Sequence, residues 1–346
     1  MKKLLLVLLS LVFLFSSFWT SAPVYAAVQI TGLEKVTIDN VDYYMTFGDE
    51  FDGNEINFKE WSYCPNWYRQ GDYCLWSDSM ANVDGQGHLV LSCDYDNEGN
   101  LLCGAVRTRG KFEQCYGYFE ASVKLQQANG FWSAFWLMPN NIDAYGYEGG
   151  SDGTEIDIYE APNYKNKNIN YAIHFDGYDS RHKSIGTNFT ADVYDGQYHR
   201  FSLLWDEHNY IFYIDGVEMY RITSEDVDIS FMPAYLKLSL ESSLGWTGKP
   251  KTEDLPNGIS VDYVRVYQRY DDYWIENPVY GDLNMTFDID SDDIRRLRKY
   301  LVKSDIFIKE QNADVNCDMQ VDVKDYLILR KYFTKEINKL PHKGGL

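Results

Sequence analysis

The stretch Gly153-Thr-Glu155-Ile-Asp157-Ile-Tyr-Glu160-Ala-Pro162 places three carboxylates among β-branched and aromatic residues. Such residues favour a β-strand, in which side chains two positions apart share a face. Glu155 and Asp157 therefore point the same way, whereas Glu160 has the opposite parity. A β-bulge near Ile158–Tyr159 would add one residue and restore the parity, and bulges are over-represented next to active sites. The spacing thus predicts a bulged strand that carries three acids on one surface.

Carboxylates grouped on one surface are the groups that retaining glycoside hydrolysis requires. One carboxylate attacks the anomeric carbon, and a second, kept protonated by its neighbours, donates a proton to the leaving oxygen. Retention needs the two carboxyl groups about 5–5.5 Å apart, which side chains that lean together on a concave sheet can reach. A surface strand rich in acids, or a calcium site, is the alternative interpretation.

The segment Glu155–Glu160 resembles the bulged E-x-D-x-x-E signature of glycoside hydrolase family 16, the family of laminarinases, lichenases, agarases and carrageenases. By position, Glu155 resembles the nucleophile, Glu160 the general acid/base and Asp157 the acid that orients the nucleophile. The resemblance implies a concanavalin-like β-jelly-roll sandwich and no cofactor for catalysis. Supporting segments lie in the expected order between residues 40 and 268: Phe47–Gly53 with Trp61, Lys111–Phe112, Tyr116–Glu120, Gly130–Pro139 and Val261–Tyr267.

The pattern of the chain also predicts the all-β class without the resemblance. Short β-like runs separated by turns occupy residues 28–267, and Asp215-Gly216 between two of them is a strong signal for a two-residue hairpin. No long stretch with a 3.6-residue apolar period appears before residue 290. Many short antiparallel strands favour a sandwich with one sheet curved to hold a polymer. Two cysteine pairs could face each other across turns: Cys93 with Cys103, and Cys64 with Cys74.

Further candidate site residues follow from their position relative to the acids. A hairpin after the acidic strand would place His174 beside Glu155 and Asp157, where it resembles the active-site histidine of the family; a structural role is the alternative. Trp132 and Trp136 share a parity on the preceding strand and are candidates for a sugar platform, although one of them could face the core. Tryptophans in polar loops are candidates for outer sugar subsites: Trp67, Trp76 and Trp246.

The C-terminal part of the chain contains an internal repeat. Each copy has oxygen-bearing side chains at the spacing of an EF-hand-type calcium loop, followed by a segment with an apolar helical face. The two segments have apolar positions at Ile294, Leu297, Tyr300 and Leu301, and at Ile328, Leu329, Tyr332 and Phe333. The candidate Ca²⁺ ligands are Asp282, Asn284, Thr286, Asp288, Asp290 and Asp293 in the first loop, and Asp314, Asn316, Asp318, Gln320, Asp322 and Asp325 in the second.

This repeat resembles a type I dockerin, the module that attaches enzymes to a cellulosome scaffold by binding a cohesin. Phe287 and Met319 stand where such loops normally have glycine, and Thr286 replaces an acid. We therefore expect calcium in the second loop and weaker binding in the first; an EF-hand pair that only stabilises the fold is the alternative. Separately, the family 16 resemblance implies a structural calcium position at Glu50, the Gly87 backbone and Asp262.

The beginning of the chain is typical of a secretory signal. Lys2-Lys3 precedes an apolar run, and Val24-Tyr-Ala26 fits a small-residue cleavage site. No later stretch is apolar over the roughly 20 residues that a membrane span needs. The formal net charge of −20 argues against nucleic acid or an anionic membrane as a partner. We expect a secreted, extracellular protein.

Together these features predict a cellulosome-associated retaining endo-β-glucanase that acts on β-1,3-1,4- or β-1,3-glucan. The alternatives are a transglycosylase, a xyloglucan- or galactan-active family 16 enzyme, and a non-catalytic carbohydrate-binding protein, although intact Glu155 and Glu160 argue against the last. A sulfated galactan is less favoured because Lys and Arg are sparse near the acidic motif. The expected organisation is a signal peptide at 1–26, a catalytic domain at 27–269, a linker at 270–280 and a dockerin-like module at 281–338.

Overall fold

The computed structural model describes residues 29–32, 35–65, 74–140, 142, 149–269, 279–284, 289–303, 308–318 and 320–341. The predicted signal peptide and most of the predicted linker lie outside these residues. Three candidate site residues also lie outside them: Trp67, Thr286 and Asp288.

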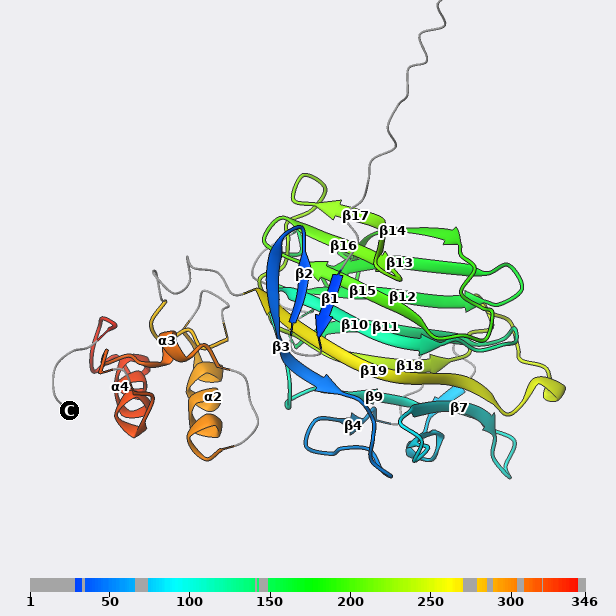
Figure 1. The fold of residues 1–346 in the computed structure, drawn as a ribbon, viewed down its shortest axis with the longest axis horizontal. Helices are drawn as coiled ribbons and strands as arrows, with labels where there is room; N and C mark the ends of the chain where they lie inside the picture. Colours follow the sequence, from blue (N-terminus) through cyan, green and yellow to red (C-terminus); the bar gives the residue numbers. More distant parts are fainter. Residues whose placement is uncertain are drawn as a thin grey trace, which may run out of the picture.

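Two β-sheets packed face to face form the larger part of the described chain (Figure 1). Within the described residues, one sheet has 12 strands and follows the order β1-β2-β3-β19-β10-β15-β16-β17, with β5 to β8 attached beside β19. The other has seven strands in the order β14-β13-β12-β11-β18-β9-β4. Neighbouring strands are antiparallel except β5 and β8. The predicted all-β sandwich is therefore confirmed.

The larger sheet consists of β1 (Gln29–Gly32), β2 (Lys35–Ile38), β3 (Val41–Asp49), β5 (Cys74–Trp76), β6 (Ala81–Val83), β7 (Leu89–Tyr95), β8 (Leu101–Cys103), β10 (Gly117–Lys124), β15 (His199–Trp205), β16 (Asn209–Ile214), β17 (Val217–Thr223) and β19 (Asn257–Arg269). The smaller sheet consists of β4 (Ser62–Tyr63), β9 (Ala105–Arg107), β11 (Trp132–Pro139), β12 (Thr154–Asn163), β13 (Asn168–Phe175), β14 (Lys183–Thr190) and β18 (Ala234–Glu241). Two short 3₁₀ helices are η1 (Asp78–Met80) and η2 (Thr252–Asp254).

The space between the sheets is filled by aromatic and branched side chains. Trp61 and Trp205 are fully buried there, and Tyr159 of β12 packs on Phe201 of β15 with ring centroids 4.2 Å apart. Burial of one such side chain contributes roughly 1.5–3 kcal/mol, so this shared core holds the two sheets together. The smaller sheet therefore has one face against the core and one face free to form a site.

The turns follow from residues that tolerate a positive φ. Asp215 and Gly216, with φ of 51° and 80°, join β16 to β17 as the two-residue hairpin that the sequence predicts. Cys93 and Cys103 are cross-strand neighbours on β7 and β8 with sulfur atoms 3.0 Å apart, so the first predicted pair does face each other. All six cysteines of the chain are free thiols in this structure.

The C-terminal helices lie to one side of the sandwich (Figure 1). They are α2 (Ser291–Leu301), α3 (Glu310–Ala313) and α4 (Val323–Phe333), and α2 contacts α4 around a small core that contains Leu297 and Leu329. On the predicted apolar face of the second helix, Ile328 and Leu329 are buried, whereas Phe333 is 47% exposed. Among the described residues, no helix has the length and apolar character needed to cross a membrane.

Candidate active site

The strand β12 contains a bulge between its second and third acids. Trp136 of β11 pairs with Asp157 and Phe135 pairs with Tyr159, so that Ile158 is an extra residue. Ile158 and Tyr159 are both fully buried on the core side, although they are adjacent in sequence. The side chain of Glu160 consequently returns to the opposite face. The bulge predicted at this place is confirmed.

The free face of the smaller sheet forms a cleft of about 540 Å³ around the acids. Small residues flank the acids on the neighbouring strands and leave room there: Ala172 pairs with Asp157, Gly186 with Ala172, and Ala134 with Glu160. The cleft is lined by Trp132, Ala134, Trp136, Glu155, Asp157, Glu160, Asn170, Ala172, His174, Tyr178, His182, Ser184, Ile185, Gly186, Glu241 and Trp246. None of these described residues is Lys or Arg.

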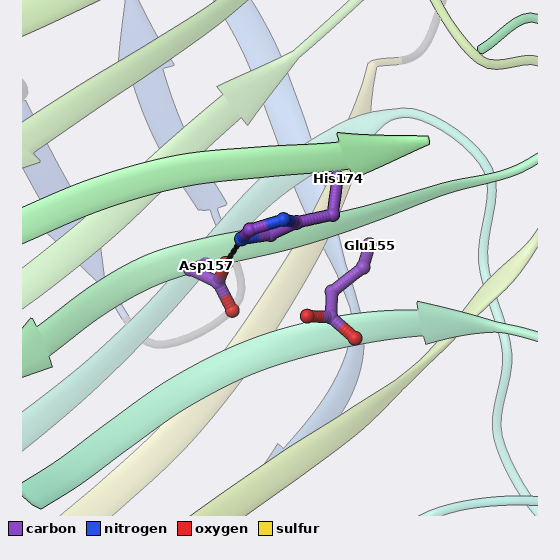
Figure 2. A group of neighbouring side chains, drawn as sticks. All are labelled: Glu155, Asp157 and His174. Carbon is purple, nitrogen blue, oxygen red and sulfur yellow. Dashed lines mark ion pairs between the residues drawn. The ribbon is translucent and has the colours of Figure 1, made fainter. Parts of the chain in front are cut away.

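Asp157 is paired with His174 from the neighbouring strand (Figure 2). The two strands place His174 opposite Glu155 in register, and its Nε2 lies 3.4 Å from Asp157 Oδ2. Asp157 is 4% exposed, and His174 compensates part of its charge when the imidazole is protonated. One ligand atom each from Glu155, Asp157 and His174 lies within 4.8 Å of the others. The hairpin therefore brings the histidine to the position that the sequence predicts.

Glu160 lies in an environment that favours its protonated form. Burial raises the pKa of Glu160 well above the usual carboxyl value, and the charge of Asp157 raises it further. Asn170 opposes this rise, since its Nδ2 donates a hydrogen bond to Glu160 Oε2. The charges of Glu155 and Glu241 add smaller upward contributions to the pKa. A buried carboxyl with a raised pKa can donate a proton at neutral pH, as a general acid must.

Glu155 is held from the loop that follows β13. The hydroxyl of Tyr178 donates a hydrogen bond to Glu155 Oε2 and lies 3.7 Å from the sulfur of Met138. The Tyr178 ring stacks near His182 at a centroid distance of 5.8 Å, and His182 in turn stacks on His174 at 5.1 Å. A short hydrogen bond from a neutral donor favours the ionised form of a carboxyl group. The arrangement suits a carboxylate nucleophile.

Tryptophans border the acids on the side of β11 and β18. Trp132 packs edge-on against Trp246, with centroids 4.8 Å apart, and both rings line the cleft. Trp136 also lines the cleft, and its Nε1 donates to Ser239 Oγ at 3.1 Å. The Nζ of Lys237 lies 3.5 Å from the centre of the Trp136 ring, a cation–π contact that fixes the indole. Indole rings in these positions can stack on sugar rings.

Trp76 and Glu50 each contact a cationic side chain. Trp76 is 4% exposed, is not among the described residues that line the cleft, and lies with its ring centre 4.8 Å from Lys237 Nζ. Its role in substrate binding stays a prediction. Glu50 forms a two-pronged ion pair with Arg265, at 2.8 and 2.7 Å, while Asp262 accepts a hydrogen bond from Ser122 Oγ at 3.3 Å. Calcium binding by Glu50, the Gly87 backbone and Asp262 stays a prediction.

The C-terminal loops contain the donor set that a calcium ion requires. Asp282 and Asp293 are fully buried, and Asn284 is 7% exposed. Burial raises the pKa of Asp293 to about 8, and Asp282 adds to the rise. Buried acids side by side are costly without a cation, so this set of oxygen atoms fits Ca²⁺. Asp293 also closes a capping box with Asp290 at the start of α2.

The second loop repeats this arrangement. Asp325 accepts hydrogen bonds from the amides of Asn316 and Asp322, and it closes the capping box of α4. Asp318 N donates to Asp314 Oδ1 at 3.0 Å, which draws the first part of the loop into a tight turn. The remaining predicted ligand, Gln320, is exposed and donates its backbone amide to Asp318. The helices that follow the two loops therefore begin with the same capping box.

Several cleft residues were not among those predicted. Asn170, Tyr178, His182 and Glu241 all line the cleft. The hairpin register that places His174 also places Asn170 opposite Glu160, so Asn170 could have been found from the sequence. Tyr178 and His182 lie in a loop whose path no periodic pattern predicts, and Glu241 comes from a strand distant in sequence.

Two segments of the chain match known protein families. Residues 69–265 match the family described as glycosyl hydrolases family 16, and residues 280–334 match the dockerin type I domain. Over 333 residues the chain is 25% identical to a beta-glucanase of Acetivibrio thermocellus, an alignment that covers 92% of this chain and 84% of that protein.

Other relatives align with part of the chain. A glucan endo-1,3-beta-glucosidase A1 of Niallia circulans is 27% identical over 64% of this chain, and a keratan-sulfate endo-1,4-beta-galactosidase of Sphingobacterium multivorum is 29% identical over 68%. The chain spans only 37% and 58% of the length of these two relatives. The solved endo-beta-1,3-glucanase from Pyrococcus furiosus superposes with a TM-score of 0.56 at 25% identity, over 69% of this chain and 99% of that one.

Proposed function

Because the chain belongs to glycosyl hydrolase family 16, we propose that it is a retaining endo-β-glucanase that cleaves β-1,3- or β-1,3-1,4-glucan. The observation that carries the proposal is the bulge of β12, which brings Glu155, Asp157 and Glu160 into one cleft. In this proposal Glu155 attacks the anomeric carbon, while Glu160 gives its proton to the glycosidic oxygen. Glu160 then takes a proton from the water that releases the sugar from Glu155.

The surroundings of each acid support this division of roles. Glu155 accepts a hydrogen bond from Tyr178, which favours the charged form that a nucleophile needs. The raised pKa of Glu160 favours the neutral form that a proton donor needs. Asp157 lies between them and, through His174, keeps its position next to the nucleophile. The cleft-lining residues include no Lys or Arg, which supports a neutral glucan over a sulfated polymer.

The substrate is tested with a panel of polymers. We expect endo-hydrolysis of β-1,3-1,4-glucan or β-1,3-glucan and a retained anomeric configuration in the first product seen by NMR. Xyloglucan, an agar or carrageenan, and keratan sulfate serve as comparison substrates. Cleavage of only these three would show that the substrate is not a β-1,3- or β-1,3-1,4-glucan. Binding without cleavage of any polymer would contradict an enzymatic role.

The roles of the two glutamates are tested by chemical rescue. Glu155→Gln is expected to abolish turnover and to leave polymer binding intact, because binding relies on aromatic and hydroxyl contacts. With an activated substrate, azide should rescue Glu155→Ala as the α-glycosyl azide and Glu160→Ala as the β-glycosyl azide. The opposite stereochemistry in the two variants would reverse the assignment, since azide replaces whichever carboxylate is missing.

We also propose that the protein is secreted and bound to a cellulosome scaffold. The dockerin match at residues 280–334 supports a cohesin as the partner, with Ca²⁺ in the loops that precede α2 and α4. The signal-like residues 1–26 support export, and the organisation into a catalytic domain at 27–269, a linker at 270–280 and a dockerin at 281–338 belongs to the same proposal. Co-migration with a panel of purified cohesins in native gels, with and without Ca²⁺, tests it.

A further inference from the structure

The neighbouring strands β12 and β13 bring three side chains of metal-binding type to one point of the cleft. Glu155 and Asp157 lie two residues apart on β12, and His174 lies opposite Glu155 on β13. His174 Nε2 is 3.4 Å from Asp157 Oδ2, and one ligand atom from each of the three side chains lies within 4.8 Å of the other two (Figure 2). Ligand atoms bonded at about 2.0–2.2 Å around a tetrahedral Zn²⁺ lie about 3.3–3.6 Å from one another. Small side-chain movements therefore suffice to bring all three to one ion.

Asp157 contributes a buried oxygen that calls for a positive partner. The residue is 4% exposed, and among the described residues its Oδ2 accepts no hydrogen bond. A buried carboxylate oxygen without donors is costly, and the nearby imidazole of His174 compensates its charge only when the ring is protonated. A metal ion between the two side chains would supply a lasting positive charge at this oxygen.

His182 orients His174 for such an ion. Its Nε2 lies 2.9 Å from His174 Nδ1, and the two rings stack with centroids 5.1 Å apart. A neutral His174 ring that donates from Nδ1 to His182 carries no proton on Nε2, so its lone pair there faces Asp157. Histidines that bind metals commonly donate their other ring N–H to a neighbour, which fixes the tautomer. The hydroxyl of Tyr178, which donates to Glu155 Oε2, holds the second carboxylate in a similar way.

The charge of the cleft also favours a cation. The described lining includes four carboxyl side chains and no Lys or Arg, and clefts lined by one sign of charge concentrate ions of the opposite sign. The four are Glu155, Asp157, Glu160 and Glu241. An imidazole nitrogen among the ligands suits Zn²⁺ and other transition metals, whereas Ca²⁺ prefers about six to eight oxygen ligands.

We propose that Glu155, Asp157 and His174 bind a divalent transition-metal ion such as Zn²⁺, and that the bound ion inhibits the protein. The ion takes the place of the proton between His174 Nε2 and Asp157 Oδ2, and that proton leaves to solvent. Zn²⁺ sites that are open to solvent typically have three protein ligands and a water molecule, which the cleft has room to hold. Inhibition rests on the proposed function, since the ion occupies the carboxylate that attacks the anomeric carbon; metal binding does not rest on it.

The test is isothermal titration calorimetry of the full chain with Zn²⁺, in excess Ca²⁺ that fills the C-terminal loops. We expect His174→Gln and Asp157→Asn to lose a binding event that the wild type shows at one ion per chain. His182→Phe keeps a ring but removes the acceptor, so it should bind about 10- to 100-fold more weakly. The matched control is His208→Gln, which alters an exposed histidine between β15 and β16 and should bind as the wild type does. Circular dichroism verifies that each variant is folded.

Kinetics on the cleaved glucan report the effect of the ion. Zn²⁺ should raise KM and leave kcat unchanged, whereas Mg²⁺ at the same concentration should alter neither. A wild type that binds no Zn²⁺, or equal binding by wild type, His174→Gln and Asp157→Asn, would overturn the inference whether or not glucan is cleaved. Binding through His174 without inhibition would overturn the inhibitory role. If Zn²⁺ binds through His174 and the metal-free protein cleaves no glucan, the metal site stands and the proposed function fails.

Discussion

At the scale of single residues, each of the three acids of β12 has a partner of its own. A tyrosine hydroxyl donates to Glu155, an imidazole pairs with Asp157, and a carboxamide donates to Glu160. Burial nevertheless dominates at Glu160 and keeps its pKa raised. Two carboxyl groups on one strand are thereby pushed toward different protonation states, which is the condition for using one as nucleophile and the other as acid.

The hydroxyl of Tyr178 is expected to hold Glu155 in its charged, attacking form. Tyr178→Phe should lower kcat about 10- to 100-fold, the usual cost of a lost hydrogen bond to a charged group. The variant removes a hydrogen bond that stabilises the charged carboxylate, so the acidic limb of the pH–rate profile should move to higher pH. Steady-state kinetics across pH on the cleaved glucan measures both effects.

The control for this variant is Tyr44→Phe, which alters a tyrosine that is 45% exposed on β3 of the other sheet. It should match the wild type in kcat and pH profile. If Tyr178→Phe raised KM alone and left the acidic limb in place, the hydroxyl would contact substrate and not position the nucleophile.

The carboxylate of Glu241 contributes to the raised pKa of Glu160. A nearby negative charge disfavours ionisation of Glu160, so Glu241→Gln should lower that pKa. The general acid then loses its proton at lower pH, and the basic limb of kcat/KM should move to lower pH with little change in the acidic limb. The exposed Glu225→Gln is the control and should leave both limbs in place. A basic limb that moved upward would contradict Glu160 as the acid.

At the scale of the elements, one extra residue between Asp157 and Glu160 in β12 determines the arrangement of the site. Two consecutive side chains, Ile158 and Tyr159, point into the core, and this irregularity returns Glu160 to the cleft. A regular strand of the same composition would bury Glu160 between the sheets. The bulge and the pairing of β12 with β11 and β13 therefore act together to place the three acids on the cleft face.

Deletion of Ile158 tests the contribution of the bulge. Without this extra residue Glu155, Asp157 and Glu160 alternate regularly on one face, and Glu160 stays opposite Asn170, so hydrolysis should persist. The loss of one buried side chain should lower the melting temperature. The matched control is Ile158→Val, which keeps the number of residues in β12. It should cost only about 0.5–1.5 kcal/mol of stability, with activity retained. Activity measurements and thermal unfolding by circular dichroism report the two effects. A folded deletion variant without turnover would contradict the assignment of Ile158 as the extra residue of the bulge.

Much of this arrangement was accessible from the sequence, because local rules determine it. Strand periodicity, the Asp215-Gly216 hairpin and the parity of the acids predicted the sandwich and the bulge. The burial of Trp76, outside the described lining of the cleft, could not be predicted because it depends on strands that are distant in sequence. Tyr178 and Glu241 escaped prediction for the same reason: a loop path and a non-local strand order bring them to the cleft.

At the scale of the whole molecule, the sandwich and the helical module have separate cores. The helices surround Leu297 and Leu329, whereas the inter-sheet core lies between the two sheets. A contact between the two parts is the bond from Lys299 Nζ to the carbonyl oxygen of Gly110, at 3.1 Å. Separate cores imply that the helical module can lose its structure while the sandwich retains its own.

Removal of calcium should therefore separate two functions of the protein. Chelation with EDTA is expected to abolish cohesin binding, because the buried acids around Asp293 repel each other without a cation. Glucan hydrolysis and the main thermal transition of the sandwich should remain. Native gels, reducing-sugar assays and calorimetry on one sample measure all three. Loss of hydrolysis with cohesin binding retained would contradict this division of roles.

The absence of Lys and Arg from the described lining of the cleft has a consequence for the media in which the protein works. A neutral glucan held by indoles, carboxamides and hydroxyl contacts carries no counterions to release, and it is not steered by charge. Dissolved salt should then have little influence on how the polymer is captured, even though the chain itself carries a net charge of −20. Substrate capture of this kind is suited equally to dilute fresh water and to brine.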